Sequence, residues 1–438
     1  MGDSPDLGPA PDQSAAPDQS AVPDDSVQEE YVALDAPRDG VPNVVADPRA
    51  LAALIASIAG GTGPVAIDAE RASGYRYGQD AYLVQLRREG SGTHLIDPVG
   101  CPDLSALDAV LAEVEWVLHA ATQDIPCLAE LGLHPRLLFD TELGARLVGL
   151  PRAGLSSVLE YYLGVTLAKE HSAVDWSTRP LPTPWLLYAA LDVELLIPLR
   201  DRMERDLREQ GKLDWARQEF AALTTFTGPK VKPEPWRRVG GASKLRTRRA
   251  LGTLRALWMA REDIAKERDV SPGRIVPEST LLDLASRSPR DAAALSNPRP
   301  DKSHSRARRA QQGVRRYQSQ WLAAINDAAQ LTDDELPALR GESHGIPPPR
   351  SWADRNPEAS QRLLAAKPLM AELAEQHDVP VENLVTPDTL RRVLWDPPHE
   401  ADADAVSHAL TALGARAWQC ELVAPVVAQA LADATAPD

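Results

Sequence analysis

The chain has 438 residues, enough for roughly two to four domains, and its net charge is −16. It lacks an apolar run of about 18 residues, which argues against a membrane-spanning helix, and its first residues lack the basic and apolar regions of a secretory signal. Cys101, Cys127 and Cys420 show no metal-site spacing. We therefore expect a protein of the reducing cytoplasm without membrane association.

The charge is unevenly distributed along the chain. Residues 1–47 contain eleven acidic residues and one arginine, a net charge of −10. Residues 230–316 contain 22 basic and nine acidic residues, a net charge of +13. Because phosphate binding depends on the local density of basic side chains, the middle of this acidic chain remains a candidate for binding a polyanion.

The first segment is rich in proline and acidic residues. Residues 10–26 form a near-repeat with a period of six, marked by Pro11, Pro17 and Pro23. Few apolar side chains and one sign of charge cannot support a packed core, so we expect residues 1–42 to be a disordered acidic tail.

The next segment, residues 43–225, alternates between strand and helix patterns and predicts a mixed sheet with helices on its faces. Strands are expected at 64–70, 81–89, 93–98 and 115–120, a helix at 104–114, a strand passing into a helix at 137–149, and one long helix at 183–207.

Two later segments contain an internal repeat. Residues 264–281 align without gaps to residues 373–390, so that Asp269 matches Asp378. Both copies follow apolar residues at helical spacing. The repeat predicts two small all-α domains, at 230–320 and 345–435, joined by a proline-containing spacer.

Four carboxylates and one tyrosine stand out in the α/β segment. Asp68 and Glu70 share one side of a strand end, Asp124 follows a later strand, and Tyr188 and Asp192 share a helix face. Taken singly, each has an ordinary explanation: a solvated strand end, an acid at a helix N-terminus, or a buried tyrosine hydrogen bond. Four carboxylates converging from three segments can instead hold two divalent cations about 3.5–4 Å apart, an arrangement suited to phosphodiester hydrolysis.

These residues resemble the three motifs of the DEDD exonucleases, in the tyrosine subclass that contains ribonuclease D. The motifs are D-A-E at 68–70, H-x-x-x-x-D at 119–124 and Y-x-x-x-D at 188–192, with D-W-x-x-R-P-L at 175–181 before the third. The resemblance implies a ribonuclease H-like exonuclease domain at 43–225. It also implies two tandem helicase-and-ribonuclease-D C-terminal (HRDC) domains after it.

The resemblance also implies an activity and a role for each motif residue. The expected enzyme is a metal-dependent 3′→5′ exoribonuclease that trims structured RNA such as tRNA precursors. Asp68 would bridge two metal ions, Glu70 and Asp192 would complete the site of the attacking water, Asp124 would hold the second ion, and Tyr188 would position the water. Oxygen ligands favour Mg²⁺ or Mn²⁺ as these cofactors.

Other polar residues are candidates for substrate contact. Tyr75 and Tyr77 precede the second strand and could stack on nucleotides. Asp140 precedes a helix and is better explained as its N-cap. The substrate-binding candidates are Gln85, His119, Trp176 and Arg179 in the α/β segment, and Arg237, Arg238, Arg248 and Arg249 in the first helical segment.

Two alternative functions remain at this stage. A DNA 3′→5′ exonuclease of the same fold would use the same carboxylates, because nothing in the composition distinguishes RNA from DNA. A non-catalytic RNA-binding scaffold would keep the fold and lose metal ligands, and the presence of all five motif residues argues against it.

Overall fold

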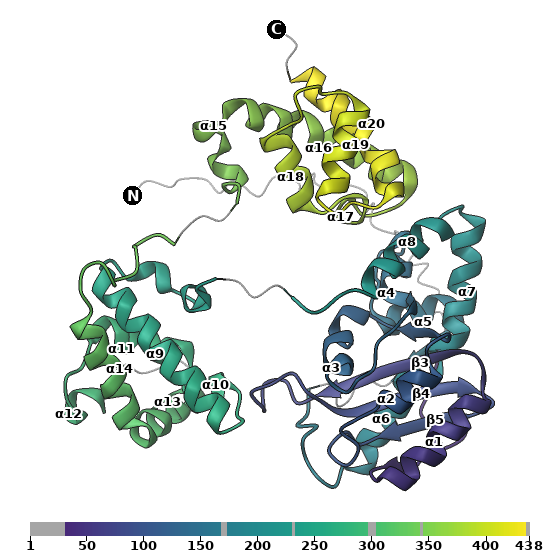
Figure 1. Cartoon of the computed structure of the whole chain (residues 1–438), viewed down its shortest axis with the longest axis horizontal. Helices are drawn as coiled ribbons and strands as arrows, with labels where there is room; N and C mark the ends of the chain where they lie inside the picture. Colours follow the sequence, from purple (N-terminus) through teal and green to yellow (C-terminus); the bar gives the residue numbers. More distant parts are fainter. Residues whose placement is uncertain (1–30, 168–172, 230–232, 297–303, 342–344, 435–438) are drawn as a thin grey trace, which may run out of the picture.

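The computed structural model describes residues 31–167, 173–229, 233–296, 304–341 and 345–434. Figure 1 shows an α/β domain, in purple to teal, followed by two helical units, in teal-green and yellow-green. Among the described residues, no helix is both long and apolar enough to cross a membrane.

The predicted acidic tail lies mostly outside the described residues, since residues 1–30 are not among them. Its predicted end at residue 42 is wrong. Strand β1 (Val32–Leu34) pairs in parallel with β8 (Val165–Leu167), so the folded part of the chain begins before residue 42.

The α/β domain is built on a mixed sheet, as predicted. Six strands lie in the order β2-β5-β4-β3-β6-β7, with β3–β4 and β4–β5 antiparallel and the other pairs parallel. The strands are β2 (Val44–Val45), β3 (Thr62–Arg71), β4 (Ala81–Glu89), β5 (Gly92–Ile96), β6 (Glu115–Leu118) and β7 (Leu137–Asp140).

Helices cover both faces of this sheet. On one face, Ile67 and Leu86 pack with residues of α1 (Pro48–Gly60), α2 (Ser105–Val110) and α3 (Ile125–Glu130). On the other face, Leu83 and Leu95 pack beneath α6 (Thr183–Glu194). Asp68 and Glu70 alternate with Ile67 and Ala69 along β3, so their side chains point toward α6.

The single long helix predicted at 183–207 is two helices. Helix α6 ends at Glu194 and α7 (Leu196–Glu209) begins after a non-helical Leu195. Pro198 has no amide hydrogen to donate to the carbonyl of Glu194, four residues earlier, which explains the break. Helices α4 (Thr141–Leu147), α5 (Leu155–Leu163) and α8 (Leu213–Leu223) complete the domain.

The two helical units share a local order of elements. In the first unit, α9 (Arg248–Glu267), α10 (Pro272–Ile275) and α11 (Glu278–Arg287) follow one another, and in the second, α16 (Pro357–His377), α17 (Val381–Leu384) and α18 (Pro387–Trp395) do the same. The remaining helices are η2 (Pro235–Arg238), η3 (Ala242–Lys244), α12 (Ala292–Leu295), α13 (His304–Arg316) and α14 (Gln318–Gln330) in the first unit, and η4 (Pro349–Ser351), α15 (Trp352–Arg355), α19 (Ala403–Ala412) and α20 (Ala417–Asp433) in the second.

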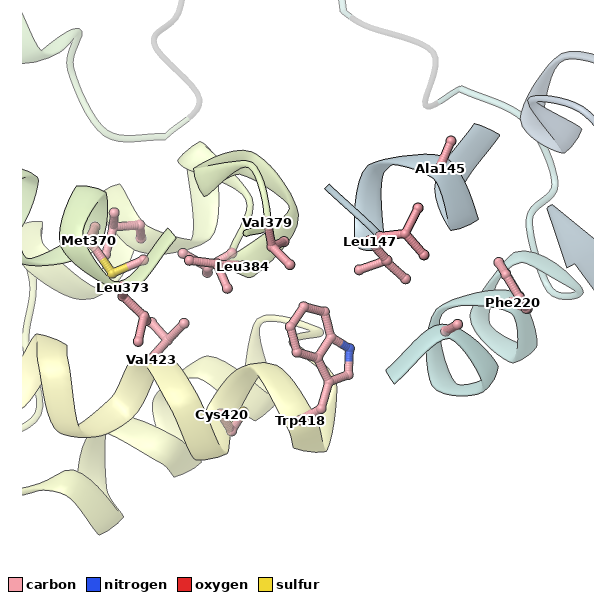
Figure 2. Close-up of a cluster of buried hydrophobic side chains, with 14 of the residues drawn as sticks. Ala145, Leu147, Phe220, Met370, Leu373, Val379, Leu384, Trp418, Cys420 and Val423 are labelled. Atoms are coloured by element: carbon pink, nitrogen blue, oxygen red, sulfur yellow. The ribbon is translucent and has the colours of Figure 1, made fainter. Parts of the chain in front are cut away.

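The second helical unit shares a hydrophobic core with the α/β domain. Figure 2 shows Trp418 of α20 lying between its own unit and Leu147 and Phe220 of the α/β domain. The Trp418 ring also stacks on Trp215, with 4.8 Å between the ring centroids. This core fixes the second unit against the domain.

Candidate active site

Three of the predicted metal ligands lie together in the structure. Strand β3 presents Asp68 and Glu70 to the face covered by α6, and α6 presents Tyr188 and Asp192 back toward them. One carboxylate oxygen each from Asp68, Glu70 and Asp192 lies within 4.8 Å of the other two. A cluster of this size can surround one or more small cations with oxygen ligands.

Asp124, the fourth carboxylate, lies between the short 3-10 helix η1 (Ala121–Gln123) and α3, in the loop that follows β6, and is only 5% exposed. This loop is held by Asp140, whose carboxylate accepts hydrogen bonds from the amides of Ala120 at 3.1 Å and Ala121 at 2.9 Å. The same carboxylate accepts bonds from two amides in the first turn of α4, so Asp140 is the predicted N-cap of that helix. Asp140 thereby connects β7 and α4 to the loop that places Asp124.

All five predicted catalytic residues line one cavity of about 250 Å³. Its wall also contains Arg71, Gln123 and His119, together with apolar Leu155 and Leu196. The cavity is therefore lined by carboxylates, one arginine and apolar side chains that could contact a nucleotide.

The carboxylates of this cavity raise one another's pKa. Burial, followed by the charges of Asp68, Asp192 and Asp124, raises the pKa of Glu70 to about 10. Burial and the charge of Asp68 hold the pKa of Asp124 and of Asp192 well above the usual value. The charged form of the cluster thus requires cations to compensate it, and the all-oxygen donor set fits divalent metal ions.

Comparison with known proteins decides the family. A model described as 3′-5′ exonuclease matches residues 42–208, an HRDC domain model matches 250–325, and a model described as 3′ to 5′ exonuclease C-terminal domain matches 345–431. Ribonuclease D of Sphingobium indicum is 35% identical over 58% of this chain and 67% of its own length. Ribonuclease D of Gluconacetobacter diazotrophicus is 30% identical over 76% of this chain and 81% of its own. The chain belongs to the ribonuclease D family.

Solved structures agree with this assignment. The crystal structure of a protein from Bifidobacterium adolescentis matches 92% of this chain and all of its own, with a TM-score of 0.82 and 39% identity. Escherichia coli RNase D, described as an exoribonuclease involved in structured RNA processing, matches 89% of this chain and 98% of its own, with a TM-score of 0.64 and 27% identity. The predicted fold class and the 3′→5′ exoribonuclease activity are confirmed, and the substrate of this ribonuclease D is RNA.

The domain matches refine one prediction. The first helical unit contains the HRDC match, whereas the second matches a model with a different description. The assignment of residues 345–435 as a second HRDC-like copy therefore stays a prediction.

Three residues of the α/β domain that were predicted to contact the substrate make contacts within the protein. Gln85 is fully buried beside Asp68 in the β3–β4 register, and Trp176 is fully buried against Trp185. Arg179 donates two hydrogen bonds to the Asp97 carboxylate, at 2.8 and 2.7 Å. Gln85 and Trp176 are fully buried and do not present a surface to RNA in this structure. The Arg179 side chain is 28% exposed, and its contact with RNA stays a prediction.

His119 keeps its place in the cavity wall. Its Nδ1 lies 2.9 Å from the Thr141 hydroxyl, and burial lowers the pKa of His119 to about 4, so the ring is neutral. Contact between this neutral ring and the substrate remains a prediction.

Three of the four predicted arginines of the first helical unit bind main-chain carbonyls. Arg248 donates to the carbonyls of Asp333, Leu336 and Pro337, and Arg249 donates to that of Leu331 at 2.7 Å. These bonds fasten the segment after α14.

Arg237 pairs with Glu234 at 2.6 Å and donates to the carbonyl of Ala338. These bonds give Arg237, Arg248 and Arg249 a role within the protein, and their contact with RNA stays a prediction. Arg238 is exposed and, among the described residues, makes no hydrogen bond, so it stays a candidate.

The two tyrosines before β4 also have another use. Tyr75 lies under the guanidinium of Arg274, 4.0 Å from its ring centroid, and the Tyr75 carbonyl accepts the amide of Ser271. Tyr77 packs against the core of the first helical unit. Tyr75 and Tyr77 attach this unit to the domain, and their stacking on nucleotides stays a prediction.

Sequence reasoning missed four residues of the cavity. Leu155 and Leu196 are ordinary apolar helix residues in the sequence, and Gln123 has no signal beyond its position before Asp124. Arg71 directly follows Glu70, but strict strand alternation places it on the opposite face.

Proposed function

We propose that this protein removes nucleotides from single-stranded 3′ ends of structured RNA, such as tRNA precursors. The observation that carries the proposal is the convergence of Asp68, Glu70 and Asp192 within 4.8 Å in the same cavity as Asp124 and Tyr188. The description of the Escherichia coli enzyme as acting in structured RNA processing supports the substrate class.

The carboxylates of Asp68, Glu70, Asp124 and Asp192 would hold two divalent ions, Mg²⁺ or Mn²⁺. When bound, such ions polarise the phosphate and lower the pKa of water. Asp68 is the residue best placed to serve both ions, because the pKa of each of the other three carboxyl groups is raised by its charge.

Tyr188 positions the attacking water in this proposal. Burial, followed by the charges of Asp192, Glu70 and Asp68, raises the pKa of Tyr188, so the phenol stays protonated. A neutral hydroxyl can orient the water by hydrogen bonding but cannot accept its proton as a base. The water oxygen bonds to phosphorus, the bond to the 3′-oxygen breaks, and the terminal nucleotide leaves as a 5′-monophosphate. The water gives one proton to solvent and the 3′-oxygen takes one up, so the shortened RNA ends in a 3′-hydroxyl.

Exposed arginines of the first helical unit would hold the RNA backbone. Arg308, Arg309, Arg315 and Arg316 lie on α13 with exposed side chains, and Arg238 is exposed on η2. They replace the arginines that bind main-chain carbonyls as the proposed phosphate contacts.

The test uses 5′-labelled RNA with a duplex and a short 3′ tail, beside DNA of the same sequence. Wild-type protein and the Asp68→Ala variant are compared in Mg²⁺, Mn²⁺ and chelator, with exposed Asp35→Ala as the matched control. We expect metal-dependent shortening of the RNA by wild type and Asp35→Ala only. Intact RNA despite tight binding would support the scaffold alternative, and equal shortening of DNA would contradict the RNA preference.

A further inference from the structure

Arg71 places a positive charge in the wall of the carboxylate cavity. It is the last residue of β3, directly after Glu70, and its side chain is half-buried. It lines the cavity together with Asp68, Asp124 and Asp192. None of the roles proposed above uses this arginine.

A break in the β3–β4 register lies directly beside Arg71. Glu70 pairs with Leu83 and Arg71 with Ala81, which leaves Tyr82 as an extra residue on β4. In a regular strand, Arg71 would point away from the face that carries Asp68 and Glu70. The extra residue belongs to β4, so β3 keeps its alternation and Arg71 lies on the side of its partner Ala81 and of α3. From this last position of the strand, Arg71 borders the cavity together with Asp124.

The guanidinium of Arg71 has no partner among the described residues, since it makes neither a hydrogen bond nor an ion pair with them. Other arginines of the domain differ: Arg87 pairs with Glu194 at 3.1 Å and Arg179 with Asp97 at 2.7 Å. A guanidinium carries five N–H donors, and those of Arg71 are available to water or to a ligand in the cavity.

The charge of Arg71 nevertheless acts on the cavity. It lowers the pKa of Asp68, Glu70 and Asp124, against the larger upward effect of burial. The guanidinium is therefore near the carboxylates without being paired to any of them.

We propose that Arg71 donates hydrogen bonds to the non-bridging oxygens of the scissile phosphate. The planar guanidinium matches two oxygens of one phosphate, and the cavity is small enough that a phosphate at the carboxylates is within reach of its wall. This inference rests on the proposed function of the cavity. It adds a cationic contact on the substrate side that the four carboxylates cannot supply.

The test compares Arg71→Gln and Arg71→Lys with Arg49→Gln, an exposed arginine on α1. Steady-state hydrolysis of the tailed RNA is measured at saturating Mg²⁺, together with the Mg²⁺ concentration that gives half-maximal rate. We expect Arg71→Gln to lower kcat/KM about tenfold or more, because a charge-assisted hydrogen bond is lost. Arg71→Lys should recover part of this loss, and Arg49→Gln should behave as wild type.

A second measurement separates phosphate contact from a purely structural role. Replacing one non-bridging oxygen of the scissile phosphate by sulfur weakens hydrogen bonding to it. We expect this sulfur substitution to slow wild type more than Arg71→Gln. The half-maximal Mg²⁺ concentration should not rise in Arg71→Gln, since removing a positive charge cannot weaken cation binding electrostatically.

Three outcomes would overturn the inference. The first is an unchanged kcat/KM in Arg71→Gln, and the second is an equal sulfur effect in both proteins. The third is a loss of activity in Arg71→Gln that is fully explained by a lower melting temperature or by a higher Mg²⁺ requirement. A wild-type protein that binds the RNA without shortening it would instead reject the proposed function, and this inference with it.

Discussion

Asp269 and Asp378 occupy matching positions in the two helical units, and both contact the α/β domain. Each ends the long first helix of its repeat with a positive φ, 46° for Asp269 and 48° for Asp378. The Asp269 carboxylate accepts hydrogen bonds from Arg76 at 3.1 Å and from the Tyr77 amide at 3.3 Å. The Asp378 carbonyl accepts one from Lys212 at 3.3 Å. The same position of the repeat therefore contacts the α/β domain in both units, at Arg76 and Tyr77 in the first unit and at Lys212 in the second.

The two attachments differ in strength. The Arg76 and Asp269 side chains are 39% and 51% exposed, and pairs of this kind contribute at most about 1 kcal/mol. The second unit adds a shared hydrophobic core to its polar contacts. The position of the first unit relative to the α/β domain is therefore easier to change than that of the second unit.

Asp269→Asn should loosen the first unit without unfolding it. Asparagine tolerates the left-handed backbone at this position, while its loss of charge removes the ion pair to Arg76. We expect kcat/KM on the tailed duplex RNA to fall a few-fold, with little change on a trinucleotide and a melting temperature close to wild type. Exposed Asp327→Asn on α14 is the control. Equal losses on the long and short substrates would contradict this coupling.

Trp418→Ala should destabilise the α/β domain and the second unit together. The change removes a buried ring, its stack on Trp215 and its hydrogen bond to Glu219, which costs about 3–5 kcal/mol. Calorimetry should show one transition for these two parts shifting to lower temperature, and Trp418→Phe should shift it less. Separate transitions for the two parts in the wild type would argue against a common core.

Metal and pH should act together on stability. The folded-state pKa of Glu70 is raised from 4.5 to about 10, so in metal-free protein its stabilising contribution is present below about pH 4.5 and is lost as pH rises toward 10. We expect the melting temperature in chelator to fall over this range. Mg²⁺ at about 100 times its Kd adds about 2.7 kcal/mol, and its effect should be larger at alkaline pH because the carboxylates are then charged.

Glu70→Gln is the control for this pH dependence, because it removes the titrating group while keeping the size of the side chain. Its metal-free melting temperature should depend less on pH than that of the wild type. An identical pH profile for Glu70→Gln and wild type would show that other groups cause the effect.

Asp140→Ala should displace the loop that carries Asp124. The substitution leaves the amides of Ala120 and Ala121 without an acceptor and removes the cap of α4, which together cost about 2–4 kcal/mol. We expect lower stability and a higher Mg²⁺ requirement for RNA hydrolysis. Asp103→Ala, which removes an acceptor for the amide of Ser105 only, should do neither. A stable Asp140→Ala protein with normal Mg²⁺ dependence would contradict this positioning role.

Asp192→Asn should remove activity while leaving RNA affinity largely intact. The amide keeps the shape of the side chain and loses the negative charge that helps hold a cation, so kcat should fall at least about a hundredfold. Fluorescence anisotropy with the tailed RNA measures affinity separately from turnover. A parallel loss of binding would make the carboxylate a structural residue.

Local patterns in the sequence were sufficient for strands β3 to β7, the mixed sheet and the carboxylate cluster, but not for the short strands β1, β2 and β8. Asp68 and Glu70 end an apolar strand, and Tyr188 and Asp192 are four residues apart on a helix, so local periodicity already placed each pair on one face. Asp140 was recognisable as a cap because a helix pattern follows it at once. These features depend on neighbours in the sequence.

Features that depend on distant partners could not be predicted in this way. Arg248 and Arg249 belong to a basic run typical of a nucleic-acid surface, yet they bind carbonyls about 80 residues later in the chain. Arg179 finds Asp97 across 82 residues. Arg71 lines the cavity from the last position of β3, although strand alternation separates it from Asp68 and Glu70. Basic composition alone does not separate an arginine that binds RNA from one that fastens a loop.

The β1–β8 pairing decides where the N-terminal segment can be cut. A truncation at residue 42 would remove β1, expose the edge of β8 and delete Asp39, which pairs with Arg87 at 3.3 Å. It would also delete Val41, which belongs to the same hydrophobic cluster as Trp176, Ala189 and Tyr188. A variant starting at Tyr31 keeps these contacts. Its RNA affinity would then report the electrostatic effect of the acidic residues alone, without damage to the helix that carries the catalytic tyrosine.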